Sequence, residues 1–172
     1  MPSSAPHVRR VEPAEYDQLG QLTLAIYQDI GFNDGPGHAE VLRDVARRDA
    51  EAEVLVATDA AGRLLGTVTY APPGSPWADI ATPQEAEVRM LGVEPAARGQ
   101  GIGEALVRAC IARARAAGLA RLVLCTQPHM HAAQRLYARL GFDRTPSRDW
   151  SPEPHLQLMA YVLPLATHQE HP

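Results

Sequence analysis

Residues 98–103 read Arg98-Gly99-Gln100-Gly101-Ile102-Gly103, a glycine-rich turn between a β-rich run and the clearest helical pattern of the chain. The first backbone N–H groups of a helix have no partner inside the helix, and the helix dipole favours an anion at that end. Glycines allow open dihedral angles and let phosphate oxygens approach the amides without a Cβ in the way. The turn therefore predicts a phosphate site at the start of a helix.

The kind of phosphate ligand is narrowed by what surrounds these glycines. A dinucleotide-binding G-x-G-x-x-G pattern fails, because the sixth position is Glu104 when counted from Gly99 and Leu106 when counted from Gly101. All 16 basic residues are Arg, so the chain has no Lys for a Walker-type phosphate loop or for a Schiff base. A nucleotide-binding protein stays as an alternative that competition between ATP and CoA would test.

The elements next to the turn are a strand over residues 85–93 and a helix over residues 101–117, which Gly118 closes. A short apolar strand over residues 121–125 follows. Because a helix connects these two strands, we expect them to run parallel. A further helix over residues 131–140 ends at Gly141.

The rest of the chain supplies strands and helices with loops between them. We expect further strands over residues 7–11, 53–58, 64–70 and 156–163, helices over 14–30 and 38–49, and loops over 31–37, 71–84 and 144–154. The order β-α-α-β-β-β-α-β-α-β predicts an α/β fold in which about four helices flank a mixed, mostly antiparallel central sheet. A single domain is expected, with its core over about 7–164 and flexible termini at 1–6 and 165–172.

Two motifs at a suitable separation resemble the GNAT superfamily of N-acetyltransferases. The first is the Arg-x-x-Gly-x-Gly turn after Leu91-Gly92-Val93, and the second is His131-Ala132-Ala133-Gln134-Arg135-Leu136-Tyr137 followed by Leu140-Gly141-Phe142. The resemblance covers about residues 64–142 and implies a GNAT-like fold that takes acetyl-CoA as cosubstrate. It says little about the acceptor.

The resemblance also implies cofactor contacts at particular positions. Leu91, Gly92 and Val93 would bind the pantetheine arm as if it were another strand. The pyrophosphate would lie on Arg98, Gly99, Gln100, Gly101, Ile102, Gly103 and Glu104. Met130 departs from the family pattern, because many members carry Asn seven residues before the tyrosine, so we expect weaker or rearranged contacts there.

Acetyl transfer to an amine needs a base, because an alkyl ammonium group has a pKa near ~10. Glu87 stands where several family members place that base, acting directly or through water. Alternatively, Glu85 or Glu87 is a solvent-facing strand charge or an ion-pair partner of Arg89. The resemblance makes Tyr137 the general acid toward the departing thiolate, and a backbone amide near Leu91 the group that polarises the thioester carbonyl. Simple packing is the alternative for Tyr137.

The sequence says least about the residues of the acceptor pocket. If the chain folds as the family does, Tyr27, residues 31–38, Trp77 and Asp79 would wall that pocket. Trp77 with Asp79 could stack on a cationic amine and neutralise it, or Trp77 could simply anchor a long proline-rich loop.

Other site chemistry finds little support. Cys110 and Cys125 lack C-x-x-C spacing and are expected to be small apolar core residues, Cys125 with a raised thiol pKa that makes it a poor nucleophile. The histidines form no H-x-x-x-H pair, so no metal site is expected. The net charge is -4 without a basic stripe, which argues against nucleic acid as a partner.

The sequence has no apolar run near the ~18 residues of a membrane span and no signal peptide, so we expect a cytoplasmic protein that does not bind membranes. A homodimer is expected from the family resemblance alone. The leading hypothesis is direct acetyl transfer from acetyl-CoA, in a ternary complex, to a primary amine of a small metabolite, an antibiotic-like molecule or a peptide. The alternative is an inactive acyl-CoA-binding or sensor module.

Overall fold

The structure, a computed structural model, describes residues 4–31 and 36–166 and divides into two compact units. The first unit consists of Met1–Tyr70 and Met90–Ala109, and the second of Ala71–Arg89 and Cys110–Pro172. Strand β4 (Glu85–Val93) and helix α4 (Ile102–Ala116) each contribute residues to both units. That the whole chain acts as a single domain stays a prediction.

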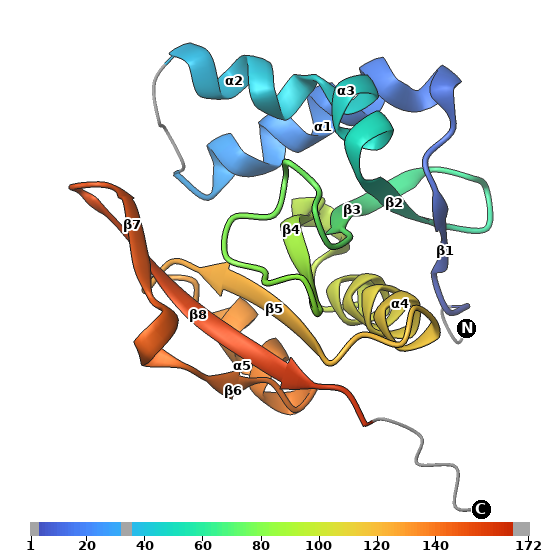
Figure 1. Cartoon of the computed structure of the whole chain (residues 1–172). Coiled ribbons are helices and arrows are strands. Elements are labelled where there is room, and N and C mark those ends of the chain that lie inside the picture. Colours follow the sequence, from blue (N-terminus) through green and yellow to red (C-terminus); the bar gives the residue numbers. More distant parts are fainter. Residues whose placement is uncertain (1–3, 32–35, 167–172) are drawn as a thin grey trace, which may run out of the picture. The chain divides into compact units, whose positions relative to one another are not determined.

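The first unit combines three helices with antiparallel strands (Figure 1). Before β4 and α4 its elements are β1 (His7–Arg10), the 3-10 helix η1 (Pro13–Glu15), α1 (Tyr16–Asp29), α2 (Pro36–Arg43), α3 (Val45–Glu51), β2 (Glu53–Thr58) and β3 (Leu64–Ala71), and η2 (Pro95–Ala97) precedes α4. The strand order is β1-β2-β3-β4, and β2 pairs antiparallel with both β1 and β3.

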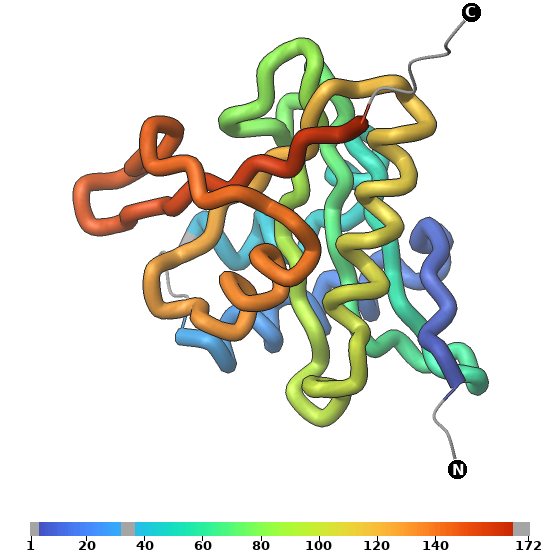
Figure 2. Tube along the Cα trace, turned by 90° about the horizontal axis from the view of Figure 1, so that it is seen from below, coloured from blue at the N-terminus to red at the C-terminus, as the bar shows by residue number. Residues whose placement is uncertain are grey.

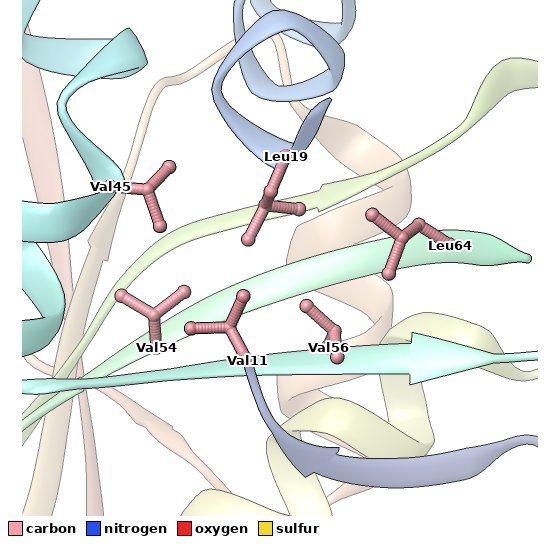
Figure 3. Packing of buried hydrophobic residues seen from close by; sticks show 6 residues of the cluster. All are labelled: Val11, Leu19, Val45, Val54, Val56 and Leu64. Carbon is pink, nitrogen blue, oxygen red and sulfur yellow. The ribbon is translucent and has the colours of Figure 1, made fainter. Parts of the chain in front are cut away.

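The core of this unit lies between its helices and strands (Figure 3). Leu19 of α1 and Val45 of α3 point toward Val54 and Val56 of β2, and all four are 1% exposed or less. Val54 and Val56 alternate along the strand and so share one face. Burial of that face against the helices removes apolar area from water and holds α1 and α3 on β2.

The second unit contains the β4–β5 pair and the C-terminal strands. Its elements after α4 are β5 (Arg121–Thr126), α5 (His131–Arg139), β6 (Asp143–Arg144), η3 (Pro146–Arg148), β7 (Trp150–Glu153) and β8 (Leu156–Pro164). The strand order is β4-β5-β8-β6, and β7 pairs with β8 in the hairpin drawn orange and red in Figure 2. As predicted, β4 and β5 run parallel, from Glu85 beside Arg121 to Val88 beside Leu124, whereas the other recorded pairs are antiparallel.

The structure confirms the mixed α/β class with its mostly antiparallel strands, and corrects several element predictions. The single helix expected over residues 38–49 is wrong: Asp44 accepts a hydrogen bond from the Arg47 N–H and starts α3 as a separate helix. The described residues therefore form five α-helices. The predicted connection over 144–154 contains β7, missed because the strand is short and irregularly paired. Residues 1–3, 32–35 and 167–172, where a loop and flexible termini were predicted, lie outside the described residues.

A glycine fixes the start of α4 against the strands of the first unit. A Cβ on Gly66 of β3 would lie 2.9 Å from the Gly92 carbonyl oxygen and 3.0 Å from Ile102 Cγ2. Strand and helix therefore approach so closely that no side chain fits between them. Because Ile102 is only 3% exposed, the turn before it has a rigid base.

Candidate active site

The glycine-rich turn of the first unit has the geometry of an anion site. Gly99 and Gly101 adopt φ of 77° and 79°, and a Cβ on either would meet nothing within 4 Å. Among the described residues, no hydrogen-bond acceptor is recorded for the backbone N–H groups of residues 99–103. Helix α4 begins at Ile102, so its dipole adds to these amides. A diphosphate fits the donors that the turn presents.

Charged side chains beside the turn are already paired. Arg98 binds Asp29 at 3.0 Å, and both side chains are about half exposed, so a phosphate can compete with Asp29 for the guanidinium. Glu104 in the first turn of α4 pairs with Arg108 at 2.9 Å, which offsets its negative charge at the anion site.

The predicted pantetheine strand begins with a backbone irregularity. Met90 has a φ of 51°, the only left-handed non-glycine residue in the part of the chain that the structure describes. The recorded β4–β5 ladder ends at Val88, just before it, so Leu91 and Val93 have no recorded partner on β5. Gly92, predicted as a cofactor contact, also has a packing reason: its Cβ would lie 3.0 Å from Ile26 Cγ2 of α1.

In the second unit, Glu85, Glu87 and Arg89 alternate along β4 and share one face, which binds residues 77–82, here called the strap. The Glu87 carboxylate oxygen Oε2 accepts three strap N–H groups, from Asp79 at 2.6 Å, Ile80 at 3.0 Å and Ala81 at 3.3 Å. The other oxygen, Oε1, is enclosed and has no partner. Burial raises the pKa of Glu87 above its usual range, even though these amide bonds oppose the shift.

Glu85 binds the other end of the strap and is fully buried. Its carboxylate accepts the Thr82 N–H at 2.9 Å and two Arg148 bonds at 2.7 and 2.9 Å, and it also pairs with Arg121. Arg148 donates to the Ile80 carbonyl at 2.8 Å as well, so it clamps the strap directly. Burial alone would raise the pKa of Glu85, but the bonds from Arg148 and Arg121 outweigh it and lower the pKa to about 2.

Arg89 also binds the strap, and its contacts correct the interpretation of the Glu85 and Glu87 charges. It pairs with Asp79 at 2.8 Å and donates to the Trp77 carbonyl oxygen. Glu85 and Glu87 are therefore neither solvent-facing charges nor partners of Arg89. Trp77 and Asp79, predicted to contact substrate, belong to the strap and both bond to Arg89. The Asp79 charge therefore already has a counterion.

Tyr137 lies in an aromatic cluster of the second unit. The side chain is 5% exposed, and its ring centroid lies 5.8 Å from that of Phe142 and 5.9 Å from that of Tyr161. The β5–β8 register places Tyr161 beside Leu124, whereas Glu87 lies beside Val123. Since neighbouring residues of a strand point to opposite faces, Tyr137 and Glu87 lie on opposite faces of these strands.

The structure adds a pair of residues that the sequence analysis did not select as a site. Cys125 is partly exposed, which corrects its assignment to the core, whereas Cys110 is fully buried. Burial and then the Glu87 charge raise the pKa of the Cys125 thiol to about 12, as predicted in direction, while the Trp150 N–H lowers it. The Trp150 Nε1 atom is enclosed, and its N–H interacts with the Cys125 thiol.

The remaining predicted residues have local roles. Met130 precedes α5, and its carbonyl accepts the Gln134 N–H at 3.1 Å. The Gln134 side chain supplies the polar group there, donating to the Gln127 and Pro128 carbonyls. Tyr27 belongs to the first unit, where its ring lies 6.4 Å from that of His38. Among residues 4–31 and 36–166, no metal-binding cluster and no helix able to span a membrane occurs.

The two motifs that carry the family resemblance lie at the start of α4 and in α5. The sequence model of the acetyltransferase (GNAT) family matches residues 17–142, and the chain belongs to this family. The recognition made from the two motifs is therefore confirmed.

Particular relatives make the comparison more specific. A mycothiol acetyltransferase from Salinispora tropica is 40% identical over 149 residues, covering 84% of this chain but 40% of the relative. The chain thus spans well under half the length of that relative. An L-methionine sulfoximine/L-methionine sulfone acetyltransferase from Pseudomonas paraeruginosa is 35% identical over 128 residues, covering 70% of this chain and 72% of the relative.

Solved structures share the fold. A GNAT family acetyltransferase from Staphylococcus aureus superposes with a TM-score of 0.74 at 16% identity, covering 94% of this chain and all of the other. One from Brucella melitensis in complex with acetyl-CoA gives 0.60 at 24% identity, covering 95% and 92%. At these identities the likeness concerns the fold alone.

Proposed function

We propose that this chain transfers an acetyl group from acetyl-CoA directly to a primary amine of a small molecule. The observation that carries the proposal is the turn at residues 99–103. Its amides lack recorded acceptors and lie at the start of helix α4. The family membership and the names of the relatives, acetyltransferases of mycothiol and of L-methionine sulfoximine, support a small acceptor.

The cosubstrate would bind largely through main-chain groups. The turn amides and Arg98 would hold the diphosphate, with Asp29 giving up its ion pair. The backbone of Leu91, Gly92 and Val93 would bind the pantetheine arm as an added strand, since no β5 partner is recorded for it.

The predicted base Glu87 and the predicted acid Tyr137 would carry out the proton transfers. The amine nitrogen attacks the thioester carbonyl carbon, its proton passes to Glu87, the C–S bond breaks, and the thiolate takes a proton from Tyr137. A raised pKa makes Glu87 a stronger base than an exposed carboxylate, and Oε1 is the oxygen without a hydrogen bond.

The test of the proposal is release of free thiol from acetyl-CoA across a panel of amines, amino acids, aminoglycosides and peptides. We expect turnover with at least one small primary amine and none without an acceptor. CoA binding without thiol release for any member of the panel would overturn the proposal.

Tyr137→Phe tests the assigned acid. We expect turnover to fall about 10²-fold while the dissociation constant of CoA stays similar, because only the proton donor is lost. Tyr161→Phe is the matched control, since it removes a hydroxyl from the same aromatic cluster. Equal turnover in wild type and Tyr137→Phe would reject the role.

A binding module without transfer is the second candidate, and the enclosure of Glu87 favours it. A carboxylate with three strap bonds and no exposed surface can serve to hold the strap alone. Thermal stabilisation by CoA, combined with a negative thiol-release panel, would identify this function.

A further inference from the structure

Arg148 contacts the strap and one of the carboxylates that bind it, and all of these contacts lie within the second unit. Its guanidinium donates to the Glu85 carboxylate at 2.7 and 2.9 Å and to the Ile80 carbonyl oxygen at 2.8 Å. The N–H of the same residue, Ile80, donates to Glu87 Oε2 at 3.0 Å. Ile80 is therefore held through its carbonyl by Arg148 and through its amide by Glu87.

The backbone at Arg148 is itself fixed to the C-terminal strands. Arg148 is the last residue of η3, and its N–H donates to the Thr145 carbonyl at 3.0 Å. The next residue, Asp149, accepts the Ala160 N–H of β8 at 2.8 Å and two Arg144 bonds at 2.6 Å. Arg148 therefore connects the strap to β8.

The position of the strap matters for Glu87, because its amides act on the charged carboxylate. A hydrogen bond to the charged form of an acid stabilises that form, and Oε2 accepts three of them, at 2.6, 3.0 and 3.3 Å. A displacement of the strap by about 1 Å would take all three amides beyond hydrogen-bond distance. The buried Glu87 charge would then lose its main-chain donors.

We propose that Arg148 is a positioning residue for acetyl transfer: it holds the strap so that the amides of residues 79–81 stay on Glu87, the proposed base. This inference rests on the proposed acetyltransferase function and adds a residue that acts through the strap. An arginine suits the role, because its planar guanidinium binds a carboxylate with two bonds and still donates to a carbonyl.

Arg148→Lys tests this role. Lysine keeps the positive charge beside buried Glu85, so the variant should fold, but its compact ammonium cannot reproduce the fork that holds Glu85 and the Ile80 carbonyl together. The substitution also keeps every charged or titratable group around Glu87, which are Asp79, Glu85, Arg89, Cys125 and the cation at position 148. A changed titration of Glu87 would therefore come from the strap and not from a lost charge.

The readout is the pH profile of kcat/KM with the best acceptor of the thiol-release panel. We expect the acid limb to move to higher pH by about one pH unit in Arg148→Lys, because fewer amides then stabilise the Glu87 carboxylate. Below that limb kcat/KM should fall about 10-fold, and well above it the variant should come within about 2-fold of wild type. A merely structural role would lower kcat/KM at every pH.

Arg121→Lys is the matched control, since Arg121 pairs with the same Glu85 carboxylate but has no recorded bond to the strap among the described residues. An acid limb that stays in place in Arg148→Lys, or that moves equally in both variants, overturns the role of Arg148 and leaves the acetyltransferase standing. Absence of turnover in wild type with every acceptor means that the proposed function fails. Titration of the Glu87 carboxyl carbon by NMR, without substrate, then tests the link to Arg148, and equal midpoints in wild type and Arg148→Lys would overturn it.

Discussion

The glycine-rich turn and the strap use their polar groups in opposite ways. At the turn, the amides of residues 99–103 have no recorded acceptor, and the two left-handed glycines face open space. At the strap, the amides of residues 79–82 all donate to Glu85 or Glu87, and Arg148 holds a strap carbonyl. The donors of one region have no recorded acceptor, whereas the other region uses its donors to hold a loop.

This difference separates binding from positioning. Unpaired main-chain donors are costly unless water or a ligand satisfies them, so an exposed set of them indicates a binding function. A carboxylate with three amide donors is already satisfied on one oxygen, so its first effect is to fix the loop. Glu87 can act on a substrate only through the oxygen that the strap leaves unbonded.

The largest expected effect is at the turn. Gly101→Val places a branched side chain at φ 79°, which strains the backbone and crowds the space that a diphosphate would occupy. We expect the dissociation constant of CoA to rise by about 10²- to 10³-fold, measured by isothermal titration calorimetry.

Gly62→Val is the matched control for that strain. Gly62 adopts φ 82° in the β2–β3 connection and also has nothing within 4 Å of its Cβ position. Both variants should lose similar stability, but only Gly101→Val should lose CoA. If Gly62→Val weakened CoA binding equally, the loss in Gly101→Val would come from general strain at a left-handed glycine. It would then not support a CoA site at the turn.

At the strap the largest effect should be on stability. Arg148→Met leaves buried Glu85 with Arg121 as its only arginine in the described contacts and releases the Ile80 carbonyl. We expect the free energy of unfolding to fall by about 3 kcal/mol in urea titrations. Arg47→Met removes an exposed pair with Glu51 and should cost less than about 0.5 kcal/mol. Equal losses would mean that the Arg148–Glu85 pair contributes no more than an ordinary surface ion pair.

The two strap carboxylates should give opposite pH dependences. The pKa of Glu85 is lowered to about 2, so its stabilisation is complete above pH 4.5 and is lost as the pH falls toward 2. That loss is about 2–3 kcal/mol. The pKa of Glu87 is raised, so its ionisation costs stability at neutral pH, and the cost disappears on mild acidification. Unfolding at several pH values should show Glu85→Gln removing the acid loss and Glu87→Gln removing the gain.

The turn could be predicted from sequence because its signal is local. Residues 98–103 contain three glycines directly before an amphipathic helix, and strand, turn and helix follow one another along the chain. The same holds for the parallel β4–β5 pair, which the connecting helix requires. Such features depend on neighbours within a few residues or on one connection.

The strap and Trp150 could not be predicted in this way. Arg148 reaches Glu85 across 63 positions of sequence, and Trp150 approaches Cys125 only through the β5–β8 and β8–β7 registers. No spacing rule along the chain encodes either contact. The left-handed Met90 also lacked a signal, because methionine rarely adopts that conformation without tertiary support.

Gly92 offers the smallest and most discriminating test, because it was predicted as a cofactor contact yet is packed like a core position. Gly92→Ala should cost about 1–2 kcal/mol of unfolding free energy through its 3.0 Å approach to Ile26 Cγ2. If packing is the whole reason for glycine, Ile26→Ala in the same chain should recover much of that cost in a double-mutant cycle. Any loss of CoA affinity in Gly92→Ala should then be restored by Ile26→Ala as well. Recovery of stability without recovery of CoA affinity would show that Gly92 is needed for contact with the ligand, like the turn. Packing against Ile26 would then not be the whole reason for glycine at this position.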